Sequence, residues 1–492
     1  MLYTGLKVYW FTVGGFGGRV RCLTRRAARI NQATGGWSKL PIKFDASRSE
    51  RGWARGGAAG EGGIKGAILA AGLGRRMEPL SATYLPKPLF PLGGRTPMAE
   101  LWLRSLVESG VTDVSMNVSV LSDTVRKHFG DGSKFAAHVD YVFEEFPSGT
   151  LGGVCKLALG RDAKRLDSTG EPPSIEPFRG STVIAPSGDI VTNFGAAQLE
   201  EMYALHKKAG AAFTMVLVPI PWERRKDFGT VILDAPEKLG GEISAFGRIE
   251  EFFEKDPDSP SNLNNASIYM IEMELLKVLD GLRTEARVEV EEPFYDFGKH
   301  VFPALIGRTH HESIGKRFPL FGARYEGLWF DVGQKRDYIT VNERLLDGEL
   351  NVPLPYESLP WGYLGANVSI DFAEVTIEPP VVIGNNCVIE PGATVGPYAV
   401  IGDDWHIKKG ARVSHSVLWG RYSFYDEEGR ETTAEERKAV DRRVVESGVT
   451  VERSIIAGGD ITSDVFEKTV DVDNEGRLRV LSIDYVPEGP RA

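Results

Sequence analysis

A repeat of six residues in the last third of the 492-residue chain is the feature that most constrains its fold. Seven aliphatic residues follow one another at intervals of six, with glycine or turn-forming residues between them. A period of six fits neither a helix, with about 3.6 residues per turn, nor a single strand, with a period of about two. Each set of hexapeptides is instead expected to form a coil of a parallel β-helix, with the aliphatic side chains stacked inward. The seven positions are Ile377, Ile383, Ile389, Val395, Ile401, Ile407 and Val413.

The repeat is interrupted once and then resumes. Residues 415–420 are echoed by residues 453–458, and the charged stretch between them, 421–443, predicts an insertion. We therefore expect the β-helix to span residues 370–466. The tail, residues 467–492, contains a turn-forming Asn-Glu-Gly between apolar runs, which is typical of a hairpin.

Residues 64–350 have a different pattern, in which short apolar runs alternate with longer helical ones. This alternation predicts βαβ units, and hence an α/β, Rossmann-like domain with a mixed, mainly parallel sheet covered by helices on both faces. Residues 351–369 would link this domain to the β-helix. The expected strands are 67–70, 114–118, 141–143, 183–185 and 213–218, and the expected helices are 98–109, 122–129, 196–209 and 273–282.

The loop after the first strand carries residues suited to phosphate binding. Residues 71–74, Ala-Gly-Leu-Gly, are followed by Arg75 and Arg76, and Lys87 stands in a Pro-Lys-Pro frame eleven residues after Arg76. Glycines let backbone N–H groups approach an anion, and the cations add charge-matched donors. Gly-x-Gly alone is equally typical of a tight turn, and the motifs of a P-loop and of a dinucleotide site are absent. The Arg76/Lys87 pair favours a triphosphate site at this carboxyl end of the sheet.

Two aspartates are candidate metal ligands. Asp189 follows the strand at 183–185, and Asp331 lies in Trp-Phe-Asp-Val-Gly at 329–333. Two carboxylates together with substrate phosphates are the usual way in which proteins hold Mg²⁺, which keeps several of its waters. Asp189 alone could equally cap a turn. The pair favours a Mg²⁺ site.

Two further segments are candidates for binding a nucleobase and a sugar phosphate. Residues 144–153 join two glutamates to a glycine-rich loop that can contact a nucleobase, or that is an ordinary strand-to-helix turn. Residues 252–255, Phe-Phe-Glu-Lys, precede an Asn-rich run at 264–269. A Glu-Lys pair with a nearby amide is suited to sugar hydroxyls and a phosphate.

In their order along the chain, these segments resemble those of the sugar-1-phosphate nucleotidylyltransferases, or NDP-sugar pyrophosphorylases. The hexapeptide region is similar to the left-handed β-helix fused to many members of that family. The Gly-Thr loop, the Phe-Glu-Lys segment and Trp-x-Asp-x-Gly are most similar to mannose-1-phosphate guanylyltransferase-like proteins. ADP-glucose and UDP- or dTDP-glucose pyrophosphorylases share most of these motifs, so the nucleotide stays open. The matching segments, within 64–348, are 66–92, 144–153, 188–189, 254–255, 264–269 and 329–333.

The resemblance implies that an NTP and a sugar 1-phosphate react to give an NDP-sugar and pyrophosphate, with Mg²⁺ as the metal. Arg76 would bind the triphosphate and Lys87 would be the catalytic lysine. The implied residues are Arg76 and Lys87 for catalysis; Ala70, Gly72, Gly74, Glu145, Gly149 and Thr150 for the nucleotide; Glu254, Lys255 and Asn265 for the sugar phosphate; and Asp189 and Asp331 for the metal.

Several positions depart from the family pattern. Arg75 stands where Thr or Ser is common, and Ala71 replaces a common glycine. The family's Glu-Lys-Pro is Glu-Lys-Asp at 254–256, and its Asn-Ala-Gly is Asn-Ala-Ser at 265–267. Pro-Ser at 186–187 precedes Gly-Asp where Asn is usual. These motifs therefore leave the sugar open.

Composition argues against several other classes of protein. The formal net charge of −10 argues against a general nucleic-acid binder. No apolar run approaches the ~20 residues that a membrane helix needs. The cysteines Cys22, Cys155 and Cys387 are scattered, which suggests neither a disulfide framework nor a zinc cluster and fits a reducing, cytoplasmic compartment.

Residues 1–63 form a basic, Gly/Arg-rich extension with eleven Lys or Arg residues against three acidic ones. They show no sustained period, so we expect disorder. An Arg-rich, acid-poor leader also resembles a transit peptide, and a start site placed too far upstream is a third interpretation. Whether this extension belongs to the mature protein stays open.

The leading hypothesis is a nucleotidyltransferase that forms a homo-oligomer through its β-helix, whose edges must be capped or paired. A catalytically quiet subunit that binds a nucleotide-sugar is the second, although it would not need to retain the catalytic and metal residues together. The third adds acetyltransferase activity, because hexapeptide acyltransferases often use a histidine as base. His406 and His415 are available, but an ordinary surface histidine is the more frequent case.

Overall fold

The computed structural model describes residues 7–12, 19–24, 63–160, 164–166, 178, 180–289, 296–309, 312–420, 443–472 and 477–487, apart from Tyr84, Val120 and Pro147. The chain forms two compact units, each built from separate pieces of sequence. The β-helix unit comprises Met1–Phe44, Gly74–Pro97 and Val332–Ala492, and the sheet unit comprises Asp45–Leu73 and Met98–Asp331. Residues 74–97, which were expected to belong to the domain at 64–350, group with the β-helix unit, and the domain limits expected from the sequence stay a prediction.

The sheet unit is built around one ten-stranded mixed sheet. Its strands are β3 (Ile64–Ile68), β6 (Asp113–Val118), β7 (His138–Phe143), β8 (Lys164–Leu166), β9 (Thr182–Pro186), β11 (Phe213–Pro219), β12 (Gly229–Lys238), β13 (Ile243–Glu254), β14 (Leu263–Glu272) and β15 (Leu320–Tyr325). Their order is β11-β15-β13-β12-β14-β9-β3-β6-β7-β8. Strands β9, β3, β6 and β7 are mutually parallel, as are β11 and β15, while β12, β13 and β14 pair antiparallel. The predicted α/β fold with a mixed sheet is confirmed.

Helices cover both faces of this sheet because alternate residues of a strand point to opposite sides. A side chain at Gly66 of β3 would press on Leu106, which lies on one face. The next residue, Ala67, packs instead in the cluster that contains Leu151 and Val154, on the other face. The helices of this unit are α2 (Met98–Glu108), α3 (Ser122–Phe129), α4 (Gly149–Leu159), α5 (Ala196–Lys208), α6 (Met273–Glu289), α7 (Phe302–Leu305) and α8 (Glu312–Arg317), with short turns η4 (Ser133–Phe135), η5 (Trp222–Asp227) and η6 (Phe297–Val301).

All five expected strands and all four expected helices coincide with observed elements to within a few residues, except that α6 continues seven residues beyond the expected end at 282. The long strands β12 and β13 were missed. Only Val231–Leu233 of β12 form an apolar run, because the outer half of the strand is exposed and carries charged residues. Its pairing with β13 brings Glu254 to the end of that strand, opposite Gly229.

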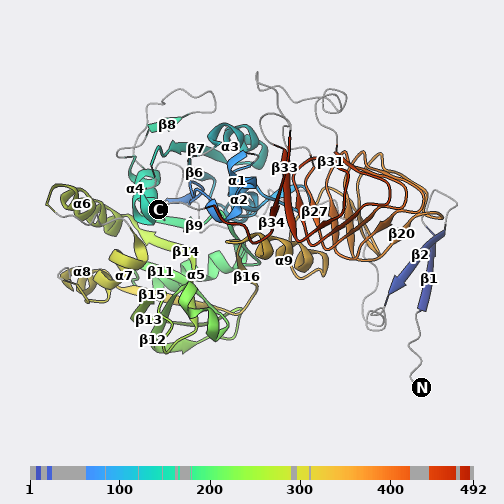
Figure 1. Ribbon diagram of the computed structural model, residues 1–492. Coiled ribbons are helices and arrows are strands. Elements are labelled where there is room, and N and C mark those ends of the chain that lie inside the picture. The colour runs from blue at the N-terminus through green and yellow to red at the C-terminus, as the bar shows by residue number, and fades with distance from the viewer. Residues whose placement is uncertain are drawn as a thin grey trace. The chain divides into compact units, whose positions relative to one another are not determined.

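The β-helix unit contains three stacked, mainly parallel sheets, whose strands form the orange to red rungs labelled from β20 to β33 in Figure 1. All seven repeated aliphatic residues are at most 2% exposed. The first sheet holds β20 (Thr376–Ile377), β23 (Thr394–Val395), β26 (Arg412–Ser414), β29 (Thr450–Glu452) and β32 (Val465–Phe466). The second holds β17 (Glu357–Leu359), β18 (Gly362–Leu364), β21 (Val381–Ile383), β24 (Ala399–Ile401), β27 (Val417–Leu418), β30 (Ile455–Ile456), β33 (Lys468–Val472) and β34 (Leu478–Ser482). The third holds β19 (Ser369–Ile370), β22 (Val388–Ile389), β25 (His406–Ile407), β28 (Arg443–Val445) and β31 (Gly459–Ile461).

The coil resumes after the interruption as the echo predicted, since Val417 pairs with Ile455 and Leu418 with Ile456. The tail hairpin is formed by antiparallel β33 and β34. The predicted insertion lies outside the described residues except for Arg443, which begins β28.

Within the predicted N-terminal extension the structure describes two strands, β1 (Lys7–Thr12) and β2 (Arg19–Thr24). They pair antiparallel, and Cys22 of β2 is in register with Ile377 of β20. The other residues before 63 lie outside the described part of the chain, and the disorder expected there stays a prediction.

The segment Gly74–Pro97 packs within the β-helix unit through an aromatic cluster. The ring of Phe90 lies 4.8 Å from that of Trp419 and 5.5 Å from that of Tyr338. The Tyr338 hydroxyl donates to the Pro91 carbonyl and accepts from Trp419 Nε1 at 3.0 Å. Asp403 of the β-helix also pairs with Arg95 at 3.3 Å. The elements involved are η2 (Arg75–Met77), α1 (Leu80–Thr83), η3 (Lys87–Leu89), β4 (Pro91–Leu92), β5 (Thr96–Pro97) and α9 (Lys335–Leu346).

Across the described residues, no helix is long and apolar enough to span a membrane.

Candidate active site

Backbone hydrogen bonds join three loops at the carboxyl edge of the parallel strands in the sheet unit. Leu69 N–H donates to the Pro186 carbonyl at 3.0 Å, and Gly188 N–H donates to the Leu69 carbonyl at 2.8 Å. Ser187 N–H donates to the Ser267 carbonyl at 2.9 Å. The loop after β3, the turn after β9 and the first half of β14 therefore lie side by side.

The two candidate metal ligands are brought together by a short ribbon of β10 (Ile190–Thr192) and β16 (Trp329–Asp331). Ile190 pairs directly with Asp331, and Asp189 is the residue before Ile190. Both aspartates are partly exposed. Ser187 Oγ donates to Asp189 Oδ1 at 2.6 Å. Two partly exposed aspartates on neighbouring strands offer oxygen donors of the kind that fits Mg²⁺.

Trp329 ties this ribbon to the expected sugar site, since its Nε1 donates to the Ala266 carbonyl at 3.0 Å. Asn265, a residue of the expected sugar site, directly precedes Ala266. Its Nδ2 donates to Tyr269 Oη at 3.0 Å, and its Oδ1 accepts from Ser267 N–H at 3.1 Å. The Asn265 side chain is thus held in one orientation at the edge of the sheet.

Two residues of this region have left-handed backbone conformations that favour glycine. Ser267 has φ of 58°, at the position where the resembling family has glycine, and Lys255 has φ of 51°. Such strain persists only where the surrounding structure holds it, and it collects at functional sites.

Glu254 and Lys255 form a loose pair, with Lys255 Nζ 4.0 Å from Glu254 Oε1. The Lys255 side chain is 62% exposed and therefore accessible to a phosphate. Burial raises the pKa of Glu254 above its usual value. Asp296 raises it further, while Lys255 and Lys299 oppose the shift.

The segment 296–301 completes this region and was missed in the sequence. A Cβ at Gly298 would collide with the Glu254 carboxylate, so the backbone there packs directly on that group. Phe297 N–H donates to Thr150 Oγ1 at 2.9 Å, and Asp296 Oδ1 accepts from Lys299 N–H at 3.1 Å. This turn therefore joins the Gly149-Thr150 loop to Glu254. A single glycine after an aromatic residue was the one signal available in the sequence.

The expected nucleotide loop is supported from beneath by a buried amide and carboxylate. Ala70 N–H donates to Asn117 Oδ1 at 2.6 Å, and Asn117 Nδ2 donates to Glu144 Oε1 at 3.3 Å. Glu144 is buried and also accepts from Ser148 N–H and Oγ, so it orders the loop rather than facing a ligand. Glu145, the residue named from the sequence, is exposed.

Gly72 leaves open space beside the backbone of this loop, and α4 begins at Gly149. No heavy atom lies within 4 Å of a Cβ built on Gly72. Gly149 begins α4 with φ of 69°, and Thr150 follows it. Backbone N–H groups at a helix start suit an anion.

The candidate catalytic residues Arg76 and Lys87 lie in the β-helix unit, where Gly74 brings their segments together. Gly74 has φ of 61°, and a Cβ there would lie 3.3 Å from Lys87 Cβ. Arg76 is exposed and its guanidinium lies against Gly333, while Lys87 is 8% exposed. The chain leaves the sheet unit between Leu73 and Gly74, and again after Asp331.

The structure thus brings the expected residues together in two groups. Within the sheet unit, hydrogen bonds and packing contacts connect the two aspartates, the sugar-phosphate residues and the nucleotide loop. Within the β-helix unit, Gly74, Arg76 and Lys87 form the second group. Within each group, the residues or the segments that carry them lie close together.

A second acidic group lies at the opposite edge of the sheet. Asp113, His138 and Asp140 are close enough to share a metal ion, but they stand at the starts of β6 and β7. Lys65, 4% exposed, already pairs with Asp113 at 2.6 Å. Ligands of such sheets bind beyond the carboxyl ends of the strands, so this group is distinct from the candidate active site.

The two β-helix histidines are both paired with glutamates. His406 Nε2 lies 2.6 Å from Glu390, and His415 Nδ1 lies 2.8 Å from Glu343 of α9. These are the ordinary pairings of surface histidines, and they do not favour an acyltransferase base.

Residues 65–348 match the protein family described as "Nucleotidyl transferase". UTP–glucose-1-phosphate uridylyltransferase of Synechocystis is 29% identical over 364 residues, covering 72% of this chain and 83% of the relative. A probable mannose-1-phosphate guanylyltransferase 3 of Oryza sativa is 28% identical, covering 72% of this chain and 86% of the relative. The mannose-1-phosphate guanyltransferase of Schizosaccharomyces pombe is 30% identical, covering 66% and 74%.

The chain therefore belongs to the nucleotidyl transferase family. These relatives are named as sugar-1-phosphate nucleotidyltransferases, and they support an enzyme of that class.

The strained turn at Ser267 yields a stability prediction. Ser267→Gly should be more stable than Ser267→Ala by about 1 kcal/mol, because both lose the hydroxyl but only alanine keeps a Cβ in the left-handed conformation. Urea unfolding of the two variants measures the difference. At Ser261, whose φ is not positive, the glycine variant should show no such advantage, and an equal advantage there would refute strain as the cause.

The raised pKa of Glu254 predicts a pH-dependent stability. A folded state that holds this proton more tightly than the unfolded chain gains stability that is full below about pH 4.5 and is lost as the pH rises through the folded-state pKa. The melting temperature of the wild type minus that of Glu254→Gln should therefore be higher at pH 4 than at pH 7.5. The exposed Glu374→Gln is the control. A difference that grows with pH would contradict the direction of the shift.

Proposed function

We propose that this protein transfers a nucleotidyl group from an NTP to a sugar 1-phosphate and releases pyrophosphate. Mannose 1-phosphate and GTP are the substrates we favour, in keeping with the mannose-1-phosphate guanylyltransferases among the relatives. The observation that carries the proposal is the chain of contacts from the Asp189/Asp331 ribbon through Trp329 to Asn265. It supports a site in which oxygen ligands for a metal and the residues expected to bind the sugar phosphate act together.

Glucose 1-phosphate with UTP is the second candidate. The Synechocystis relative is named for that reaction, and its match covers as much of this chain as the rice match does. A glucose-1-phosphate adenylyl- or thymidylyltransferase shares most of these motifs. Ser267 in place of glycine is a further reason to test the sugar directly.

In the proposed reaction, a phosphate oxygen of the sugar 1-phosphate attacks the α-phosphorus and the bond to the β-phosphate oxygen breaks. The attacking group has a second pKa of about 6 and is ionised near neutral pH, so no general base is needed. The barrier is the approach of two polyanions. Arg76 and Lys87 would stabilise the charge on the triphosphate, and Lys255 would bind the sugar phosphate.

Asp189 and Asp331 would hold Mg²⁺, which supplies positive charge to the phosphates when bound. Their donor set of two partly exposed carboxylates supports this assignment. The side chains of Glu254 and Asn265 would orient the sugar by accepting and donating hydrogen bonds to its hydroxyls.

We propose a cytoplasmic homo-oligomer with no nucleic-acid or membrane partner. The net charge of −10 and the three scattered cysteines support the compartment and the absence of nucleic acid. Leu478 and Val480 on the edge strand β34, and Phe466 on β32, are exposed apolar side chains that support assembly through the β-helix.

A pyrophosphate-release assay tests the function. The full chain with Mg²⁺ is combined in turn with ATP, CTP, GTP, UTP or dTTP, and with mannose 1-phosphate or glucose 1-phosphate. Turnover with one pair identifies the substrates. Nucleotide-sugar binding without turnover of any pair would favour the quiet regulatory subunit instead.

Loss of either a cation or a metal ligand should reduce catalysis strongly. Lys87→Ala or Asp189→Ala should lower kcat by about 10²–10³, the order seen when one preorganised charge partner is removed. The exposed Lys226→Ala, in η5, should leave kcat unchanged. A Lys87→Ala enzyme with full turnover would remove Lys87 from the mechanism.

A further inference from the structure

The first two residues of α9 hold the C-terminal segment of the chain. Lys335 is 2% exposed, and its ammonium donates to two backbone carbonyls, that of Arg76 at 3.0 Å and that of Tyr485 at 2.6 Å. The same ammonium lies 5.9 Å from the centre of the Tyr485 ring. One side chain thus joins the turn that carries Arg76 to a segment near the C-terminus.

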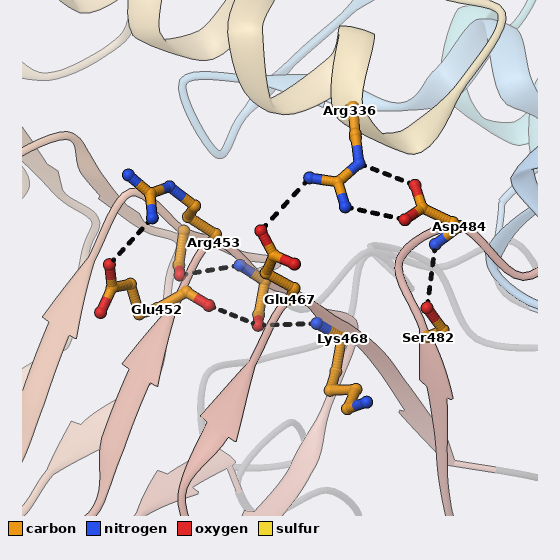
Figure 2. A network of polar contacts seen from close by, with 9 residues as sticks. Arg336, Glu452, Arg453, Glu467, Lys468, Ser482 and Asp484 are labelled. Atoms are coloured by element: carbon orange, nitrogen blue, oxygen red, sulfur yellow. Dashed lines mark hydrogen bonds and ion pairs between the residues drawn. The ribbon is translucent and has the colours of Figure 1, made fainter.

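Arg336 holds the same segment by its side chain. Its Nε and Nη2 donate to the two carboxylate oxygens of Asp484 at 2.7 and 2.8 Å, and its Nη1 lies 3.4 Å from Glu467. Figure 2 shows Arg336 reaching from its helix between these two carboxylates. A paired, planar fork of this kind fixes orientation as well as distance.

The C-terminal segment is itself ordered where it meets α9. Ile483 is 3% exposed, and its N–H donates to the Glu467 carbonyl at 2.9 Å. Tyr485 N–H donates to the Ser482 carbonyl at 3.0 Å, which closes a turn after β34. We call residues 482–485 the clasp.

The turn that carries Arg76 has few hydrogen bonds of its own. It is the three-residue η2, closed by Met77 N–H to the Gly74 carbonyl at 2.8 Å and by Glu78 N–H to the Arg75 carbonyl at 3.1 Å. Single turns of this type are weakly stable alone. The Lys335 ammonium therefore adds an anchor from a longer helix.

Keeping a lysine amine buried between two carbonyls has a free-energy cost. Burial lowers the pKa of Lys335 to about 8, although Glu78 and Asp484 favour its charged form. An apolar side chain could be buried here without this cost. The lysine is explained if its two hydrogen bonds are needed to hold the Arg76 and Tyr485 backbones in position.

We propose that Lys335 is a positioning residue, which holds the Arg75–Met77 turn so that Arg76 meets the nucleoside triphosphate, and that the clasp holds Lys335 in place. The inference rests on the proposed role of Arg76. It makes the C-terminal segment part of the nucleotide site without any contact of its own with substrate.

The kinetic test replaces Lys335 by methionine, which keeps a similar stem but removes all donors. The KM for the NTP should rise about tenfold, which corresponds to loss of a hydrogen bond from a charged group. The KM for the sugar 1-phosphate should change less than twofold. Lys408→Met, which removes an ion pair with Glu446 elsewhere in the β-helix, should change neither KM. An equal rise in both KM values for Lys335→Met would overturn the proposal.

A double-mutant cycle tests the clasp. Asp484→Asn weakens the pairing with Arg336 and should raise the KM for the NTP about threefold, because the Tyr485 carbonyl is then less well held. In the Lys335→Met background the same change should have no further effect, since the clasp acts through Lys335. Fully additive effects would refute this route.

Amide hydrogen exchange tests the anchor without reference to activity. Lys335→Met should speed exchange at Met77 and Glu78, and leave the amides of β3 and β9 unchanged, whereas Lys408→Met should change none of them. A wild type without turnover would contradict the proposed function while this measurement still decides the anchor. Unchanged exchange at Met77 and Glu78 would overturn the positioning role.

Discussion

Backbone hydrogen bonding at the carboxyl edge of the parallel strands is the constraint on which the candidate site depends. Leu69, Gly188 and Ser267 are joined there by main-chain contacts, so three loops from distant parts of the sequence are held in one place. The side chains that would act on the substrates are then presented from these loops and from the short β10–β16 ribbon. Main-chain bonds depend little on side-chain identity, so this edge can keep its shape while the side chains set the chemistry.

The candidate catalytic cations depend on a second kind of interaction. Arg76 and Lys87 stand on a segment whose far end is packed by Phe90 against Tyr338 and Trp419. Trp419 is buried and directly follows β27 of the β-helix, so the β-helix also packs against the segment that carries these cations. In this protein the β-helix supports the proposed chemistry as well as any assembly.

Much of the fold could be predicted from the sequence, because its strongest signals are periodic. The six-residue spacing of residues such as Ile401 and Ile407 has one structural solution, and the strand-helix alternation indicated the other fold. The site residues followed from short motifs at strand ends. Signals without a period were missed: the turn around Gly298, the left-handed backbone of Ser267, and the long-range contact of Lys335 with Tyr485. The turn around Gly298 and the contact of Lys335 with Tyr485 depend on residues far apart in the chain, and no local pattern encodes such pairings. The positive φ of Ser267 is unusual for a serine, so the residue type gave no sign of it.

The order in which the chain contributes to its two units has a consequence for how such a protein can evolve. Gly74–Pro97 is inserted between two pieces of the sheet unit, yet it packs on residues that come more than two hundred positions later. Exchange of the last third of the gene for that of another enzyme would separate Phe90 and Pro91 from Trp419 and Tyr338. Recombination at the apparent domain border would therefore lose this packing and lower stability. The two parts are expected to be inherited together and to diverge as a pair.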